Sequence, residues 1–204
     1  MKFHKNTLNL FIRFKIYPVI AKLKGIKDVT IICNNCIGGI LYKSFGLKFN
    51  SPFINLFINS EDFIKICLSL EDYINSDLVF IDTSENYPVA MLKDAKIHFM
   101  HYHSNEEAAL KWEERKRRVN YSELFFIFVQ RDDCTIDDLK TFNSLTYKNK
   151  IALTYKRYNQ FENTQYIKGF EETKNVDVIQ WNGYFLGKKA IDQFNFLNWF
   201  VKGL

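Results

Sequence analysis

Six short apolar runs, separated by segments with helical periodicity, constrain the fold of this chain more than any other feature. The runs lie at residues 29–33, 78–81, 95–103, 124–130, 150–155 and 176–181. Near-continuous apolar runs of this length are typical of strands buried on both faces of a parallel sheet. Helical patterns occupy segments between them, at residues 38–44, 60–74, 104–120 and 135–145. The sequence therefore predicts an α/β fold with three layers, in which a mostly parallel sheet carries helices on both faces.

The first 28 residues differ from the rest in charge. No acidic residue precedes Asp28, whereas one arginine and six lysines fall within this stretch. One helical face would carry four apolar side chains, although Pro18 should end or kink a helix near Tyr17: Leu10, Phe14, Tyr17 and Ala21. We therefore divide the chain into a basic amphipathic segment, residues 1–28, and a single α/β domain, residues 29–204. The segment either packs on the domain as its first helix, the commoner role of such helices, or makes peripheral contact with an anionic membrane.

The sequence carries no sign of export. Arg13 and Lys15 interrupt a stretch that might otherwise form a signal-peptide core, and no apolar run is long enough to span a bilayer. The cysteines are few and unevenly spaced, which fits reduced thiols better than a disulfide framework: Cys33, Cys36, Cys67 and Cys134. We expect a cytoplasmic protein, with the inner face of the membrane as an alternative location. A nucleic-acid partner is not expected, because no RNA-binding motif or basic stripe is visible beyond the first segment.

Polar residues follow each predicted strand. In an open parallel sheet, the loops that leave the carboxyl ends of the strands converge on one crevice, where ligands bind. The residues in these positions are Asn34, Asn35 and Cys36; Asp82 and Thr83; His101 and His103; Arg131, Asp132 and Asp133; Lys156 and Arg157; and Asn182 with Gly183. We expect the candidate site among them.

Cys36 is the candidate nucleophile. The sequence from Asn34 to Gly39 follows a strand and opens a helix, so its backbone amides could bind a phosphate or lower the pKa of a thiol. A thiol becomes a strong nucleophile when a histidine reaches it. The alternative is a small buried cysteine in a turn that needs glycine.

The histidines supply a candidate base. His101 and His103 are two residues apart, so on a strand they would project to one face and His98 to the other. Asp132 and Arg131 follow the next strand, where the carboxylate could bind sugar hydroxyls and the guanidinium an anion, or where both could belong to a solvated loop. No spacing requires a metal, and we assign no metal ligands.

The helical segment at 104–120 contains one anomaly. Its apolar stripe includes Ala108, Trp112 and Val119, and Arg115 lies in the middle of it. A buried guanidinium needs a partner, so we expect either a structural carboxylate, which we favour, or an anionic ligand. On a separate flank, the helical spacing of Glu107 with Lys111 and of Glu114 with Arg118 predicts solvated ion pairs.

These motifs resemble a bacterial domain-of-unknown-function family, number 1919, whose members are often labelled exopolysaccharide biosynthesis proteins. The resemblance is carried by NNCIGGILYKSFGLKFNSPFINLFI, YPVAMLKDAKIHFMHYHSNEEAALKWEERKRRVN, LFFIFVQRDDCTIDDLKTFNSL and KNKIALTY. Counterparts of the family pattern are Asn34, Asn35, Cys36, His101, Ser104, Glu107, Lys111, Trp112, Arg115, Arg118, Asn120, Arg131 and Asp132. Gln130 stands where the family pattern has an acidic residue, and Asp133 where it has glycine. A more distant likeness, to papain-like cysteine peptidases, is carried by Cys36, His101 or His103, and the basic helix, although the predicted order of strands fits that fold poorly.

The resemblance implies work on surface polysaccharides. One hypothesis is a carbohydrate-active transferase that moves a glycosyl, acyl or similar group from a nucleotide-sugar or acyl donor to a sugar or lipid-linked sugar. In it Lys111, Arg115 or Arg118 neutralises donor phosphate, His101 or His103 handles the acceptor's proton, and Asp132 binds hydroxyls. The alternatives are a non-enzymatic assembly or regulatory factor attached through residues 1–28, and a papain-like Cys/His hydrolase. The sequence assigns no cofactor and leaves open whether the chain is catalytic.

Overall fold

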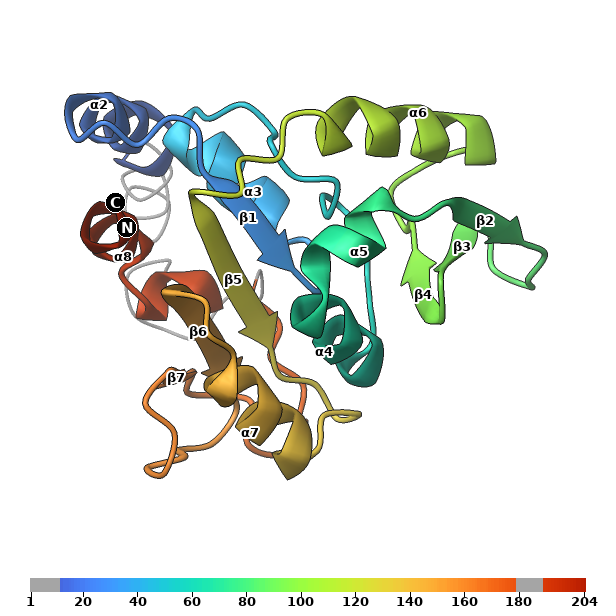
Figure 1. The fold of residues 1–204 in the computed structure, drawn as a ribbon. Helices are drawn as coiled ribbons and strands as arrows, with labels where there is room; N and C mark the ends of the chain where they lie inside the picture. Colours follow the sequence, from blue (N-terminus) through green and yellow to red (C-terminus); the bar gives the residue numbers. More distant parts are fainter. Residues whose placement is uncertain (1–11, 179–188) are drawn as a thin grey trace, which may run out of the picture.

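The computed structural model describes residues 12–178 and 189–204. The predicted α/β class is confirmed: a parallel sheet of four strands lies beside a smaller antiparallel sheet of three (Figure 1). The parallel sheet has the order β1-β5-β6-β7, with bounds Thr30–Cys33, Leu124–Val129, Asn149–Thr154 and Thr164–Tyr166. All three neighbouring pairs are parallel. Three of the six predicted strands, at 29–33, 124–130 and 150–155, therefore lie in the sheet expected for them.

The antiparallel sheet contains β2 (Leu78–Ile81), β3 (Val89–Leu92) and β4 (Ala95–His98). The prediction that the runs at 78–81 and 95–103 belong to the parallel sheet is wrong. Leu92 pairs with Ala95 across a two-residue turn in which Lys93 has a φ of 57°. A turn that short can join only antiparallel strands, since parallel strands need a long crossover.

The strand predicted at 95–103 is shorter than expected, and the one predicted at 176–181 is not found in the part that the structure describes. β4 ends at His98, and the chain then turns at Met100 and His101, so the predicted extension to His103 is wrong. In the predicted run 176–181, residues 176–178 are not in a strand, and the remainder lies outside the described residues, as do Asn182 and Gly183.

Helices cover the parallel sheet, and their bounds follow the local sequence. They are η1 (Ile12–Ile16), α2 (Tyr17–Leu23), α3 (Ile37–Phe45), α4 (Ser60–Leu68), α5 (Leu70–Asn75), α6 (Asn105–Lys116), α7 (Ile136–Ser144), η2 (Ala190–Gln193) and α8 (Phe196–Gly203). Asn59, Ser104 and Thr135 cap α4, α6 and α7 through their side chains. The segment predicted as one helix at 60–74 is two helices joined at Ser69, and the helix predicted to reach residue 120 ends at Lys116.

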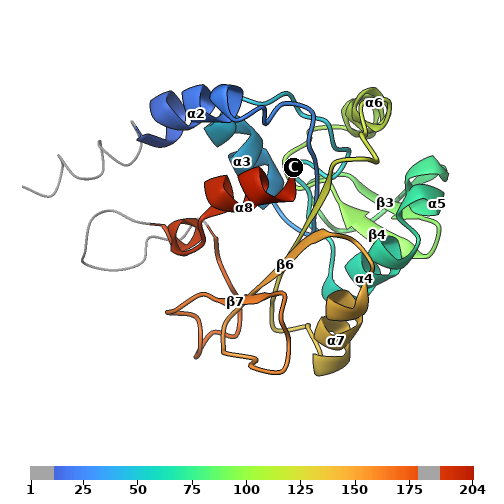
Figure 2. The same ribbon diagram turned by 60° about the vertical axis from the view of Figure 1, so that its left-hand side comes forward.

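Alternate residues of the central strands enter two different cores. Ile31 and Phe125 pack with residues of α3 and α8 in one cluster, whereas Ile32 and Phe126 pack with residues of α4, α6 and α7 in another. Figures 1 and 2 show α2, α3 and α8 on one side of the sheet and α4 and α7 on the other. Full burial of both strand faces explains why these apolar runs show no alternation. Within the described parts of the chain, no helix has the length and apolarity needed to cross a membrane.

Candidate functional site: a cysteine–histidine pair between the two sheets

Cys36 lies at the carboxyl end of β1, immediately before α3. β1 ends at Cys33, and Asn35 closes the turn by accepting a hydrogen bond from the backbone N–H of Ile37 at 3.0 Å. The two glycines that follow allow close packing, because a Cβ on Gly38 would lie 2.8 Å from Cys33 Sγ. The turn therefore presents a half-buried thiol at the beginning of a helix.

His101 completes the pair. Its Nε2 lies 3.2 Å from the Sγ of Cys36, although the two residues are 65 positions apart in the chain. This is hydrogen-bonding distance for sulfur and is the geometry by which an imidazole activates a thiol. Within residues 12–178 and 189–204, this is the single hydrogen bond recorded for His101.

A short extended segment joins the supports of the two residues. The backbone of Phe57 pairs with that of His98, at the end of β4, through hydrogen bonds of 2.8 and 2.9 Å. The next residue, Ile58, donates its N–H to the carbonyl of Asn34 at 3.0 Å. The end of β4 is thus tied to the end of β1, which explains how a histidine from the antiparallel sheet reaches a thiol on the parallel sheet.

Tyr102 holds the turn that carries His101. Its hydroxyl donates to the carbonyl of Ile54 at 2.8 Å and accepts a hydrogen bond from Arg115. Its ring packs edge-on against Phe99, with the ring centroids 5.3 Å apart. Because Tyr102 is buried while its neighbour His101 is exposed, the imidazole is positioned by the residue next to it.

The charges around Cys36 oppose one another. Burial raises the pKa of the Cys36 thiol, whereas its own backbone N–H and the guanidinium of Arg131 lower it, and Asp177 raises it. Arg131 is held with its guanidinium 4.8 Å from the centre of the Phe57 ring. With the net pKa raised, the thiol is protonated near neutral pH, so His101 must accept the proton as the sulfur reacts.

Asn34 secures the edge of the sheet on which Cys36 lies. It is fully buried, and its amide donates to the carbonyl of Val129 at 3.0 Å while accepting from the Val129 N–H at 2.9 Å. These bonds join the ends of β1 and β5. The side chain of Asn34 therefore acts as a structural clamp between these two strands.

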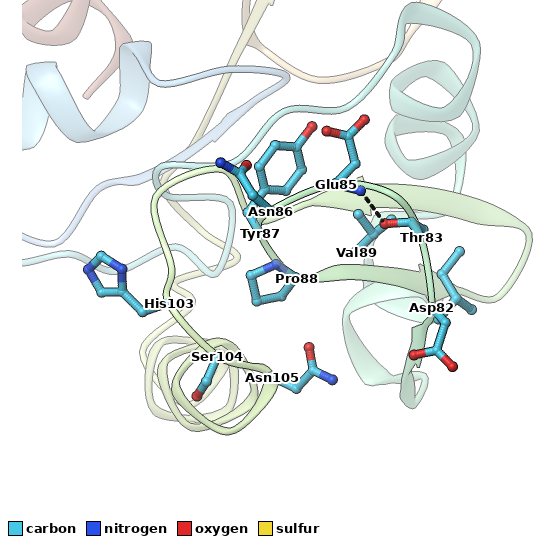
Figure 3. Close-up of a pocket in the computed structure, with 11 residues that line it drawn as sticks. Asp82, Thr83, Glu85, Asn86, Tyr87, Pro88, Val89, His103, Ser104 and Asn105 are labelled. Atoms are coloured by element: carbon cyan, nitrogen blue, oxygen red, sulfur yellow. Dashed lines mark hydrogen bonds between the residues drawn. The ribbon is translucent and has the colours of Figure 1, made fainter.

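A polar pocket of about 330 Å³ lies at the loop that joins β2 to β3, and His103, two residues from His101, is part of its lining (Figure 3). Its polar lining comes from the hairpin and from the start of α6: Asp82, Thr83, Glu85, Asn86, Tyr87, His103, Ser104 and Asn105. In Figure 3, Asp82 and Asn105 extend toward each other and His103 lies at the edge. Since His103 is two residues from His101, the Cα atoms of the two histidines are at most about 7.6 Å apart.

His101 and His103 lie beyond the end of β4, so they do not share one face of a strand. The expectation that His101 and His103 project together is wrong, because β4 ends before them and the chain turns. His101 contacts Cys36, whereas His103 lines the pocket and donates its backbone N–H to Glu107 at 2.9 Å.

The basic residues Lys111, on α6, and Arg118, just beyond its end, are engaged by a neighbouring glutamate. Arg118 pairs with Glu114, as helical spacing predicted, and also donates to the carbonyl of Phe49 at 2.9 Å. Lys111 also pairs with Glu114, rather than with Glu107, the partner predicted for it. Two residues after Arg118, the N–H of Asn120 binds Thr30, which lies at the amino end of β1. Arg118 thus lies near the amino end of β1, whereas Cys36 lies at its carboxyl end.

Arg115 is buried as predicted, but its partner is not a carboxylate. Its guanidinium donates to the hydroxyl of Tyr102 and lies 5.4 Å from the centre of the Phe49 ring and 5.8 Å from that of Tyr102. A hydroxyl and two aromatic faces therefore take the place of the expected structural carboxylate.

In the acidic loop after β5, the residue held by hydrogen bonds is Asp133. Asp133 accepts hydrogen bonds from the backbone N–H of Ser60 at 2.6 Å and from its hydroxyl at 3.1 Å, which holds the beginning of α4. Asp132 is exposed and has no recorded hydrogen bond or ion pair with the described part of the chain. The structure thus brings Cys36, His101 and Arg131 together without involving Asp132 in their contacts.

Sequence reasoning included Asp82 and Thr83 of the pocket lining but missed the other hairpin residues that line it, and it also missed Tyr102 and Asp177. Tyr102 could have been noticed as the apolar residue between two exposed histidines. Asp177 reaches the site because the N–H of Val176 bonds to the carbonyl of Gln130, at the end of β5, at 3.1 Å. No periodicity links these segments.

Over the described ranges, no group of three or more His, Cys, Asp or Glu side chains could hold a metal ion.

Comparison with known proteins adds two findings. A family model described as "Domain of unknown function (DUF1919)" matches residues 3–201. A protein of Haemophilus influenzae, described as "Uncharacterized protein", is 38% identical over 197 residues, which cover 96% of this chain and 95% of that protein.

Proposed function

The chain belongs to the DUF1919 family, and we propose that it is an acyltransferase in which Cys36 forms a thioester with the donor's acyl group and a sugar hydroxyl is the acceptor. The observation that carries this proposal is the 3.2 Å contact between Cys36 Sγ and His101 Nε2. Of the groups considered from the sequence, glycosyl or acyl, the second suits a thiol nucleophile, because thioesters are the usual covalent intermediates of cysteine enzymes.

The first half of the reaction acylates the cysteine. Cys36 Sγ gives its proton to His101 Nε2 while the sulfur attacks the acyl carbon of the donor. The bond between that carbon and the leaving group breaks, and the leaving group takes the proton from His101. Cys36 is left as a thioester and His101 as neutral imidazole.

The second half transfers the acyl group. His101 Nε2 takes the proton of the acceptor hydroxyl as its oxygen attacks the thioester carbon. The carbon–sulfur bond breaks, the acceptor leaves as an ester, and the thiolate recovers the proton from His101. Arg131 supports both halves, because the positive charge that lowers the pKa of Cys36 also favours negative charge developing at the reacting atoms.

The pocket that His103 lines supports a hydroxyl-rich acceptor. It offers carboxylates from Asp82 and Glu85 and amides from Asn86 and Asn105, with the ring of Tyr87 beside them. Groups of this kind hydrogen-bond to hydroxyls and pack against the apolar face of a sugar ring. The resemblance to exopolysaccharide biosynthesis proteins points the same way.

Covalent labelling tests the nucleophile. The full chain is incubated with p-nitrophenyl acetate or with short acyl thioesters, and its intact mass is followed. We expect one acyl group on Cys36, none on Cys36→Ala, and a rate lower by about 10²-fold or more in His101→Ala. Cys134→Ala is the matched control, because Cys134 is the other half-buried free cysteine and lies outside the pair.

The fate of the acyl group tests the acceptor. Monosaccharides, polyols and water compete for the acylated protein, and the products are measured by mass spectrometry. Transfer to a sugar that weakens in Asp82→Asn supports the proposal, whereas release to water alone would indicate a Cys/His hydrolase. If Cys36 is never acylated while Cys134 is, the proposal fails and a non-enzymatic role in the polysaccharide machinery gains support.

A further inference from the structure

An apolar ridge lies on the outer face of the first helical segment. Ile16, Val19 and Leu23 are 38%, 57% and 79% exposed. Their spacing of three and four residues puts them on one stripe of a helix. Leu23 in particular leaves most of a large apolar side chain in contact with solvent. A single exposed apolar residue is common on protein surfaces, whereas several exposed apolar residues along one helix stripe are not.

The opposite face of the same helix is already anchored to the protein. The ring of Tyr17 stacks on that of Phe45 with centroids 5.3 Å apart, and Ala21 is buried. Pro18 packs closely against Gly46, where an added Cβ would lie 3.0 Å from the proline ring. α2 is therefore docked on α3 through its inner face, and the ridge is left over after that docking.

Lysines flank the ridge. Lys15, Lys22, Lys24 and Lys27 are all exposed, and none of them forms an ion pair with a residue in the described ranges. No acidic residue occurs among the first 27 positions of the sequence. Figures 1 and 2 place α2 at the periphery of the molecule, so this apolar and basic face is accessible from outside.

We infer that this face, defined by Ile16, Val19, Leu23 and the four lysines, rests on an anionic lipid surface. The ridge enters the boundary between headgroups and acyl chains, and the lysines contact lipid phosphates. The charge of the face favours lipid over a second copy of the chain. A second copy would bring the same positively charged face against this one, whereas anionic lipid supplies the opposite charge and also accepts apolar side chains. The inference is independent of the chemistry proposed for Cys36.

Vesicle co-sedimentation of the full chain tests this inference. We expect binding to vesicles of phosphatidylglycerol with phosphatidylcholine, little binding to phosphatidylcholine alone, and weakening as salt increases, since exposed charges are screened. The double variant Val19→Glu/Leu23→Glu should lower the bound fraction at least tenfold, and Lys22→Glu/Lys24→Glu should do the same at low salt.

Leu110→Glu is the matched control, because Leu110 is 65% exposed on α6, away from the ridge. It should bind vesicles like the unmodified chain. Equal loss of binding in Leu110→Glu, or binding that ignores lipid charge, overturns the inference. An absence of vesicle binding overturns it as well; if the unmodified chain then self-associates and Val19→Glu/Leu23→Glu abolishes that association, the ridge is an interface between copies.

Discussion

The two members of the Cys36–His101 pair are supported in different ways. Cys36 lies at the carboxyl end of β1, where the side chain of the buried Asn34 joins β1 to β5 through two hydrogen bonds to the backbone of Val129. His101 lies on an exposed turn after the antiparallel sheet and is positioned through its buried neighbour Tyr102. The turn that carries Cys36 is held by buried side-chain hydrogen bonds to the backbone. The turn that carries His101 is held by the hydroxyl of Tyr102 and by the packing of its ring.

This difference predicts which changes are structural and which are functional. Damage to the Cys36 side should unfold part of the sheet, since buried backbone groups lose their partners. Damage to the His101 side should shift an exposed imidazole by a small distance and affect reaction before stability. The predictions below separate the two sides.

The largest expected effect is that of Asn34→Leu. The substitution leaves the buried N–H and carbonyl of Val129 without their side-chain partners, so we expect a loss of about 2–4 kcal/mol in the free energy of unfolding. Urea denaturation followed by circular dichroism measures it. Asn35→Ala removes only the hydrogen bond to Ile37 and serves as the control, with a smaller loss. Equal losses of stability in the two variants would show that the two bonds from Asn34 to Val129 contribute no more than the single bond from Asn35 to Ile37.

Tyr102→Phe comes next. It removes the hydroxyl between Ile54 and the buried Arg115, which should cost about 1–3 kcal/mol in stability. Because Tyr102 adjoins His101, the rate of Cys36 acylation should fall further than the stability loss explains at temperatures where the protein stays folded. Tyr121→Phe is a control on an exposed tyrosine. Unchanged acylation in folded Tyr102→Phe would remove Tyr102 from the positioning of His101.

The parts predicted from the sequence are those that the local pattern determines. β1, β5 and β6 are buried on both faces, so their composition alone marks them. α7 has a full capping box at Thr135 and Asp138, which its sequence shows directly. The stripe through Arg115 predicted that its guanidinium would point inward, and helical spacing predicted the pairing of Glu114 with Arg118.

The parts that were missed depend on pairing between distant segments. β3 is four residues long and becomes a strand by pairing with β2 and β4, and the two-residue turn at Lys93 makes that sheet antiparallel. Arg115 is matched by a hydroxyl in a turn, which helical periodicity does not predict. Of two adjacent acids, Asp133 rather than Asp132 binds α4 because it faces the N–H of Ser60, a choice made by tertiary packing. The contact of His101 with Cys36 likewise depends on the segment at Phe57 and Ile58.

Arg131→Gln and Asp177→Asn should change the reactivity of Cys36 in opposite directions. Arg131 lowers the pKa of the thiol, so its loss raises that pKa, reduces the thiolate fraction at a given pH, and should slow alkylation by iodoacetamide a few-fold. Asp177 raises the same pKa, so Asp177→Asn should speed alkylation. Lys111→Gln, which removes a charge paired with Glu114, should change neither rate. The same sign for both substitutions would contradict the electrostatic account.

The smallest effect concerns His98, at the end of β4. Burial lowers its pKa, Lys96 lowers it further, and Glu85 and Asp62 act in the opposite direction. Because the folded pKa lies below the unfolded value of 6.5, the unfolded chain takes up protons first as the pH falls. The stability that the neutral His98 contributes is therefore complete above that value and is lost as the pH drops below it toward the folded pKa. Urea unfolding of the unmodified chain and of His98→Phe, at about pH 7.5 and about pH 5.5, should show a smaller decrease in the variant, with His103→Phe as the control for loss of a histidine. If the free energy of unfolding falls by the same amount between the two pH values in the unmodified chain and in both variants, the loss of stability in acid does not arise from His98.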